Sequence, residues 1–131
     1  MQQALQYLPT NGLPSLVKQL KDLQLEVHKP PKETWDNTDI VVTNGSQDGL
    51  CKALEMLMNV GSTVLVEEYV YSGTLSIINP YEPRYQVVKC DMEGMRPDSL
   101  REILSQWSTD KLDEDETAPK FLYINPVGEE H

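Results

Sequence analysis

The sequence predicts an α/β fold with a largely parallel sheet and flanking helices. Short runs rich in β-branched and other apolar residues alternate with segments whose apolar residues recur every three or four positions. The first pattern is typical of strands and the second of amphipathic helices. Strands that alternate with helices favour a parallel sheet, because each helix returns the chain to the same end of the sheet.

Helical spacing occurs in four segments. In the first, apolar residues recur at intervals of three or four after Pro14, a residue suited to a first helical turn. Pro30-Pro31 ends this segment. The other helices are expected to begin at Ser46, which can cap its helix, at Tyr71 and at Pro97.

Strand-like runs separate these helices. Each is short and rich in apolar or β-branched residues, as strands are. The first is closed by Asn44-Gly45, a pair typical of a tight turn. We expect four strands, over residues 39–43, 63–66, 85–90 and 121–124.

The length of 131 residues and a hydrophobic content of 39% are those of one ordinary domain. We expect an N-terminal segment and helix over residues 1–38 and an α/β core over residues 39–131. No apolar run approaches the roughly 20 residues that span a bilayer, and the first residues lack a signal-peptide pattern. The sequence therefore predicts a soluble, cytoplasmic protein with no membrane partner.

The charge is strongly acidic, with a formal net value of −10 and only three arginines. Such a surface repels a phosphate backbone, so no nucleic-acid partner is expected. Part of the charge lies in residues 110–116, which we interpret as a solvated loop. Cys51 and Cys90 are far apart in sequence and have no metal-ligand spacing, so neither a zinc site nor a disulfide framework is indicated.

The segment 43–49, Thr-Asn-Gly-Ser-Gln-Asp-Gly, is the most informative local motif. A strand, a glycine turn and a helix start together present backbone N–H groups and a positive helix end, which can hold a phosphate. The plainer interpretation is a common turn with a capping serine. There is no GxGxxG or Gly-Lys-Ser/Thr motif, which argues against a dinucleotide or P-loop nucleotide site.

Aromatic residues follow the second predicted strand directly. Tyr69 and Tyr71 stand at the carboxyl end of a parallel strand, where ligands of open α/β proteins bind. A tyrosine there either stacks on a flat ring or packs in the fold. His28 and His131 are isolated and are expected at the surface. The adjacent pair Glu67-Glu68 is assigned no acid/base role, because neighbouring residues of a strand face opposite sides.

Several motifs in consistent order resemble the kynurenine/2-aminoadipate aminotransferases, which are class-I-like enzymes of fold type I that depend on pyridoxal 5′-phosphate (PLP). The similarity runs from about residue 3 to residue 126. It is carried by Ala4-Leu5-Gln6-Tyr7, Asn11-Gly12-Leu13-Pro14, Thr43-Asn44-Gly45-Ser46-Gln47-Asp48-Gly49-Leu50-Cys51-Lys52, Tyr71-Ser72-Gly73-Thr74-Leu75 and Pro97-Asp98-Ser99-Leu100-Arg101. The resemblance implies the N-terminal part of a large domain, and so an incomplete fold-type I domain.

The resemblance also implies roles for individual residues. Gly45, Ser46 and Gln47 would hold the PLP phosphate, which agrees with the helix-start argument. Tyr71 would stack on the pyridine ring and line the substrate pocket. Tyr7 would reach across a homodimer interface into the substrate site of the partner.

The sequence departs from the family pattern after the last predicted strand. There the family has a Pro, three residues and an Asn-Pro-Thr-Gly motif whose Asn contacts the cofactor ring and the substrate. With Pro126 as that Pro, Glu130-His131 stand in place of Asn-Pro. In a second, shifted register, residues 125–128 (Asn-Pro-Val-Gly) play this part with a shortened loop.

The Schiff-base lysine of the family has no counterpart in these residues. Lys52, Lys89 and Lys120 fall within the helix and strand pattern rather than in a matching motif. The implied reaction is transfer of an amino group from kynurenine, 2-aminoadipate or an aromatic amino acid to 2-oxoglutarate. PLP catalysis needs the lysine, so the chain alone is expected to be inactive. The alternative is a non-catalytic binding or regulatory module on the same scaffold.

The family topology has a consequence for the first strand. It places this strand beside one that follows the segment matched here, so residues 39–43 would form an exposed edge or lie apart from the other strands. An unpaired apolar edge invites association. We therefore expect a homo-oligomer, or association with a full-length homologue.

Overall fold

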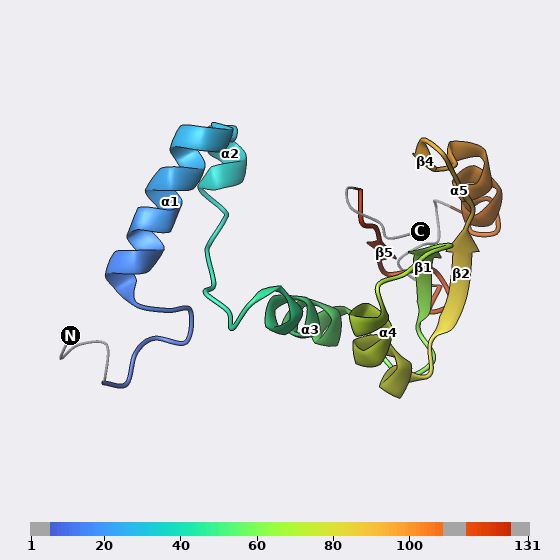
Figure 1. Cartoon of the computed structure of the whole chain (residues 1–131), viewed down its shortest axis with the longest axis horizontal. Helices are drawn as coiled ribbons and strands as arrows, with labels where there is room; N and C mark the ends of the chain where they lie inside the picture. Colours follow the sequence, from blue (N-terminus) through green and yellow to red (C-terminus); the bar gives the residue numbers. More distant parts are fainter. Residues whose placement is uncertain (1–5, 109–114, 127–131) are drawn as a thin grey trace. The chain divides into compact units, whose positions relative to one another are not determined.

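The computed structural model describes residues 6–108 and 115–126. The chain divides into two compact units, Met1–Gly49 and Leu50–His131, and the boundary falls within helix α3 (Ser46–Leu57). Each unit is described by itself, with the element labels of Figure 1.

Unit 1 consists mainly of helix α1 (Pro14–His28) and the short helix α2 (Lys32–Trp35). Pro14 occupies the start of α1, as the sequence predicts. The helix ends where Lys29 adopts a left-handed conformation, with φ 45° and ψ 53°, and donates its N–H to the Leu25 carbonyl oxygen. The following Pro30 cannot continue a helix, so the sequence itself predicts where α1 ends.

The strand expected over residues 39–43 does not form, and this expectation was wrong. The segment has no regular secondary structure, and Val41 and Val42 are exposed. Its contact with the rest of unit 1 includes a hydrogen bond of 3.0 Å from the Val42 N–H to the Asn11 carbonyl oxygen. A β-branched run becomes a strand only when a neighbour completes the ladder of hydrogen bonds, and no described strand pairs with this one.

Unit 2 is built on a parallel three-stranded sheet, which confirms the predicted fold class. Its strands are β1 (Thr63–Glu67), β2 (Arg84–Val88) and β5 (Leu122–Tyr123), in the order β2-β1-β5. Leu65 of β1 pairs with Leu122 of β5. All of β1 is buried, as expected for the central strand of a parallel sheet.

The core of unit 2 lies between this sheet and two helices. Helix α4 (Ser72–Ile78) continues into a short 3-10 helix over Asn79–Tyr81. Apolar side chains of α3 and α4 belong to the same buried cluster as side chains of β1, and Figure 1 shows where these elements lie. The buried cluster comprises Leu54, Met58, Val64, Val66 and Ile78.

A hairpin replaces the end of the strand expected over residues 85–90. Strand β2 stops at Val88, and β3 (Cys90–Asp91) pairs antiparallel with β4 (Gly94–Met95). Gly94 has φ +112°, a backbone conformation that favours glycine. The hairpin leads into helix α5 (Pro97–Leu104).

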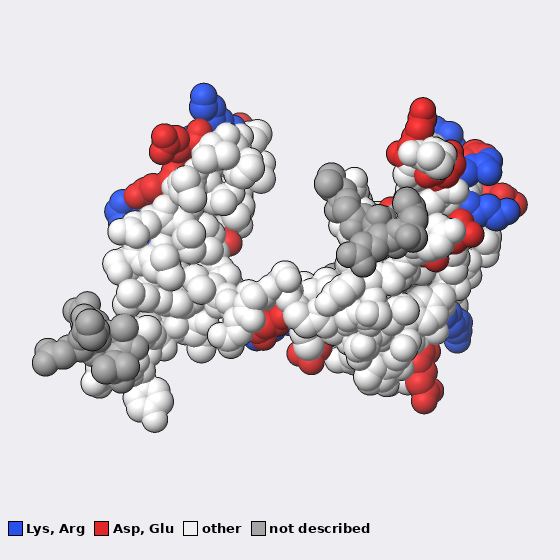
Figure 2. All heavy atoms as spheres, viewed as in Figure 1, with Lys and Arg blue, Asp and Glu red and all other residues white. Residues whose placement is uncertain are grey.

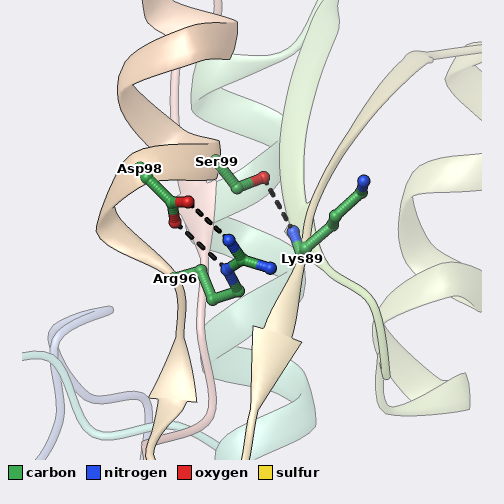
Figure 3. A network of polar contacts seen from close by, with 4 residues as sticks. All are labelled: Lys89, Arg96, Asp98 and Ser99. Carbon is green, nitrogen blue, oxygen red and sulfur yellow. Dashed lines mark hydrogen bonds and ion pairs between the residues drawn. The ribbon is translucent and has the colours of Figure 1, made fainter.

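Polar contacts tie the start of α5 to the end of β2 (Figure 3). The Arg96 Nε donates to Asp98 Oδ1 at 3.1 Å, and Arg96 also forms an ion pair with the same carboxylate. The Lys89 N–H donates to Ser99 Oγ at 3.1 Å. Charged side chains of both signs gather over this part of unit 2 in Figure 2. The Asp98-Ser99 motif therefore has a structural role at a helix start.

Candidate phosphate turn and cofactor site

The turn before α3 is held by three hydrogen bonds around Gly45. The Gly45 carbonyl oxygen accepts from the Gly49 N–H at 3.2 Å and from Thr43 Oγ1 at 3.0 Å. The Asn44 N–H donates to Asp48 Oδ2 at 2.9 Å. Gly45 has φ +96°, which a side chain would strain.

The sequence suggested Ser46 as the cap, but the helix begins at Ser46 itself, so the residue before the helix is Gly45. Ser46 is the first helical residue, and the Gly45 carbonyl oxygen accepts the first helical hydrogen bond. Ser46 and Gln47 therefore lie in the first turn, where backbone N–H groups have no carbonyl acceptor within the helix. This position suits them to donate to an anion.

The space beside the turn is open. A Cβ added at Gly45 would meet no atom within 4 Å, and Gly45, Ser46 and Gln47 are all exposed. N–H donors, a serine hydroxyl and the positive end of α3 match the chemistry of a phosphate ester. Asp48 adds one negative charge to the same turn, and its carboxylate is engaged by the Asn44 N–H. The residues present thus fit a phosphate group.

Tyr71 lies in unit 2, immediately before the first residue of α4. Its carbonyl oxygen accepts from the Thr74 N–H at 3.0 Å, which fixes the backbone, while the residue stays 58% exposed. The ring lies against Gly73: a Cβ built there would be 2.3 Å from Tyr71 Cε1. The ring therefore occupies space that only a glycine leaves free, and it presents an aromatic surface to solvent.

Tyr7 belongs to unit 1 and is fully exposed. A side chain with this exposure is available to another molecule. The structure brings Gly45, Ser46 and Gln47 together in one turn, whereas Tyr7 comes from another segment of unit 1 and Tyr71 from unit 2.

A second feature of unit 2 was not anticipated from the sequence. A cavity of about 430 Å³ lies where β1 and β5 end and the hairpin begins. Glu67 lines it and is only 5% exposed, and its Oε2 accepts from the Asn125 N–H at 2.8 Å. The carboxylate thus joins the end of β1 to the segment after β5. The sequence signal that could have found this residue is the charged Glu67 at the end of the apolar run of β1.

The remaining histidine and cysteine residues considered in the sequence form no further candidate site within the described residues. His28 is exposed at the end of α1. In residues 6–108 and 115–126, neither Cys51 nor Cys90 forms a disulfide, and no cluster of His, Cys, Asp and Glu could hold a metal. No helix within these ranges is long and apolar enough to cross a membrane. Residues 127–131, which include Glu130-His131, and residues 109–114 of the acidic run lie outside the described part.

Comparison with known proteins relates the chain to aminotransferases. No family model matches it. The mitochondrial kynurenine/α-aminoadipate aminotransferase of Bos taurus is 44% identical over 98% of this chain and 31% of its own length. The Rattus norvegicus protein is 43% identical over 97% and 31%. An aromatic amino acid aminotransferase of Schizosaccharomyces pombe is 32% identical over 96% and 25%.

Solved structures give the same result. A kynurenine aminotransferase of Pyrococcus horikoshii, in complex with PMP and kynurenine, superposes with a TM-score of 0.75 at 30% identity over 93% of this chain and 28% of its own. Aminotransferase Aro8 of Candida albicans gives 0.78 at 34% identity over 92% and 23%. The α-aminoadipate aminotransferase LysN of Thermus thermophilus, with bound N-(5′-phosphopyridoxyl)-L-leucine, gives 0.67 at 28% over 94% and 27%.

The chain is therefore homologous to part of the PLP-dependent aminotransferases of fold type I. Within them, its curated relatives include the kynurenine/α-aminoadipate aminotransferases, and it spans about 31% of their length. Both results confirm the resemblance seen in the sequence motifs.

Proposed function

We propose that these residues form the phosphate side of the cofactor pocket of an amino-acid:2-oxoglutarate aminotransferase of the kynurenine, 2-aminoadipate or aromatic type. The observation that carries the proposal is the open start of α3 at Gly45-Ser46-Gln47, in a chain related to PLP enzymes over 98% of its length.

Each residue of the proposed site has its own task. The N–H groups of the first turn of α3 and the Ser46 hydroxyl bind the phosphate. The Tyr71 ring stacks on the pyridine ring and lines the substrate pocket, where it excludes water from one face. Tyr7 contacts the substrate of a partner subunit. When bound, PLP supplies the electron sink of the reaction.

Turnover needs more than these residues supply. None of Lys52, Lys89 and Lys120 stands in a motif that matches the Schiff-base lysine. The substrates of the whole enzyme are an amino acid and a 2-oxo acid, and the proposed location is the cytoplasm, although the mammalian relatives are named mitochondrial. The 131 residues by themselves are proposed to bind PLP without transamination.

The binding test compares PLP with pyridoxal, which lacks the phosphate. Equilibrium dialysis should show tighter binding of PLP, and Ser46→Ala should reduce this preference. Ser76→Ala, which changes an exposed serine of α4, is the control and should leave it unchanged. Equal binding of PLP and pyridoxal would overturn the phosphate assignment.

The inactivity test uses borohydride reduction of the PLP-treated chain followed by peptide mapping. We expect modification spread over exposed lysines and no conversion of kynurenine in the presence of 2-oxoglutarate. Stoichiometric modification of one lysine together with turnover would contradict this part of the proposal.

A non-catalytic binding or regulatory module is the second candidate, favoured by the full exposure of Tyr7. Such a module would occupy the subunit interface of an intact homologue. Titration of the chain into the full-length Bos taurus relative distinguishes the two: a loss of activity that Tyr7→Ala abolishes supports the module, and unchanged activity excludes it.

A further inference from the structure

The sequence contains two Asn-Gly pairs, Asn11-Gly12 and Asn44-Gly45. In such a pair the glycine backbone nitrogen can attack the asparagine side-chain carbonyl carbon. The new C–N bond closes a five-membered succinimide and ammonia leaves. Water then opens the ring to aspartate or isoaspartate, so the side-chain amide is replaced by a carboxylate. Glycine favours the attack because no Cβ shields its nitrogen.

At Asn44-Gly45 the reacting groups are accessible. Both residues are exposed. The pair is anchored through the Asn44 N–H, which donates to Asp48, and through the Gly45 carbonyl oxygen, which accepts from Gly49 and Thr43. Within the described residues, neither the Asn44 side-chain amide nor the Gly45 N–H makes a hydrogen bond.

Asn11-Gly12 has the same chemistry in a different setting. The Gly12 N–H donates to the Pro9 carbonyl oxygen at 3.0 Å, and the Asn11 carbonyl oxygen accepts from the Val42 N–H at 3.0 Å. Both residues are half-buried, and a Cβ on Gly12 would be 2.9 Å from Val42 Cγ2. The attacking nitrogen is thus occupied and its surroundings are packed.

We propose that Asn44 is a site of spontaneous deamidation. The reaction adds a carboxylate to the turn over residues 44–47, which is the turn proposed to bind the phosphate. The product charge would stand beside the first turn of α3, where Asp48 already contributes one. A carboxylate is itself favoured at the positive end of a helix, so it competes with a phosphate for the same donors. This consequence for PLP rests on the proposed function, whereas the deamidation does not.

The first experiment incubates the native chain at mildly alkaline pH and follows both asparagines by peptide mass spectrometry. Asn44 should convert faster than Asn11 by about fivefold or more, the factor that one net hydrogen bond at Gly12 contributes. In denaturant the two rates should converge, because the folded contacts are gone. Equal native rates, or faster conversion of Asn11, would overturn the proposal.

A second experiment separates this proposal from the cofactor assignment. Asn44→Asp, which reproduces one product, should weaken PLP binding without weakening pyridoxal binding, and Asn44→Gln should resist conversion because its longer side chain closes a less favourable ring. Preferential conversion of Asn44 with unchanged PLP binding by Asn44→Asp upholds the modification site and overturns the phosphate role. Slow conversion of Asn44 together with tighter binding of PLP than of pyridoxal overturns the modification site and upholds the phosphate role.

Discussion

Gly73 leaves room for the Tyr71 ring, since an added Cβ would be 2.3 Å from Cε1 of that ring. In Gly73→Ala the half-exposed ring must rotate away, while alanine favours the helix by about 1 kcal/mol relative to glycine. We expect PLP and pyridoxal to bind more weakly with no loss of thermal stability. Both properties can be measured on one preparation by dialysis and by thermal unfolding.

The control for this substitution is Ser76→Ala, which introduces alanine elsewhere in α4. It should leave both cofactor forms bound as in the parent chain. If Gly73→Ala binds PLP normally, the Tyr71 ring does not stack on the cofactor.

Thr74 carries a buried hydroxyl with no hydrogen-bond partner in the described part of the chain. An unsatisfied buried hydroxyl costs free energy, and valine has nearly the same shape. Thr74→Val should therefore raise the free energy of unfolding by about 1 kcal/mol in chemical denaturation. Thr74→Ser keeps the hydroxyl and loses a methyl group, so it should lower that free energy by about 1 kcal/mol. A Val variant less stable than the Ser variant would refute the assignment.

At the scale of elements, the start of α5 has a pH-dependent anchor. The side-chain hydrogen bond from Arg96, with the backbone hydrogen bond of Ser99, holds the pKa of Asp98 below its ordinary value of 3.8. A carboxyl whose pKa is lower in the folded state stabilises that state at pH values above its ordinary pKa. This contribution is lost as the pH falls through the lower pKa of the folded state. Acid below the ordinary range should therefore loosen α5.

Arg96→Gln tests the cause of this shift. Carbon NMR of the Asp98 carboxyl should show its pKa rising toward the ordinary value, because the charged donor is gone. Arg101→Gln removes the same charge from an exposed position on the same helix and should leave that pKa nearly unchanged. The same Asp98 pKa in the parent chain and in Arg96→Gln would exclude the ion pair as the cause.

The elements that the sequence predicts well are those whose pattern is local. Pro14 starts α1 and Pro30 follows its end, and the apolar run of β1 is buried where expected. Residues 39–43 carry an equally strong β-branched pattern but form no strand, because strand formation depends on a partner segment. The hairpin at residues 90–95 escaped prediction since its strands are only two residues long.

The candidate site likewise has features that the sequence predicts and features that it does not. Motif and turn chemistry locate Gly45, Ser46 and Gln47 at a helix start, as found. Sequence periodicity does not predict two contacts of the folded chain. These are the packing of the Tyr71 ring against Gly73 and the hydrogen bond between Glu67 and Asn125. Their proposed roles toward the cofactor remain predictions for the binding experiments.

At the scale of the whole molecule, burial is uneven. Among the described residues of unit 1, only Val17 is buried, whereas unit 2 has a contiguous core. In Figure 2 charged side chains follow one side of α1, and uncharged residues cover much of its opposite side in that view. Leu16, Leu23 and Val27 share the exposed apolar stripe of α1. A helix draws most of its stability from packing of such a stripe, so unit 1 is poised to bind another surface.

We therefore predict that the chain associates through unit 1. Sedimentation velocity over a concentration series should show growing oligomers, and Leu23→Lys should lower the association constant by at least tenfold, because burying a leucine contributes about 1.5–3 kcal/mol. Leu23 is already half-exposed in the single chain, so this substitution should not unfold it. Gln19→Lys adds the same charge at an exposed polar position of α1 and should have little effect. A chain that sediments as a monomer at every concentration, with one sharp thermal transition, would show that unit 1 is stable without a partner.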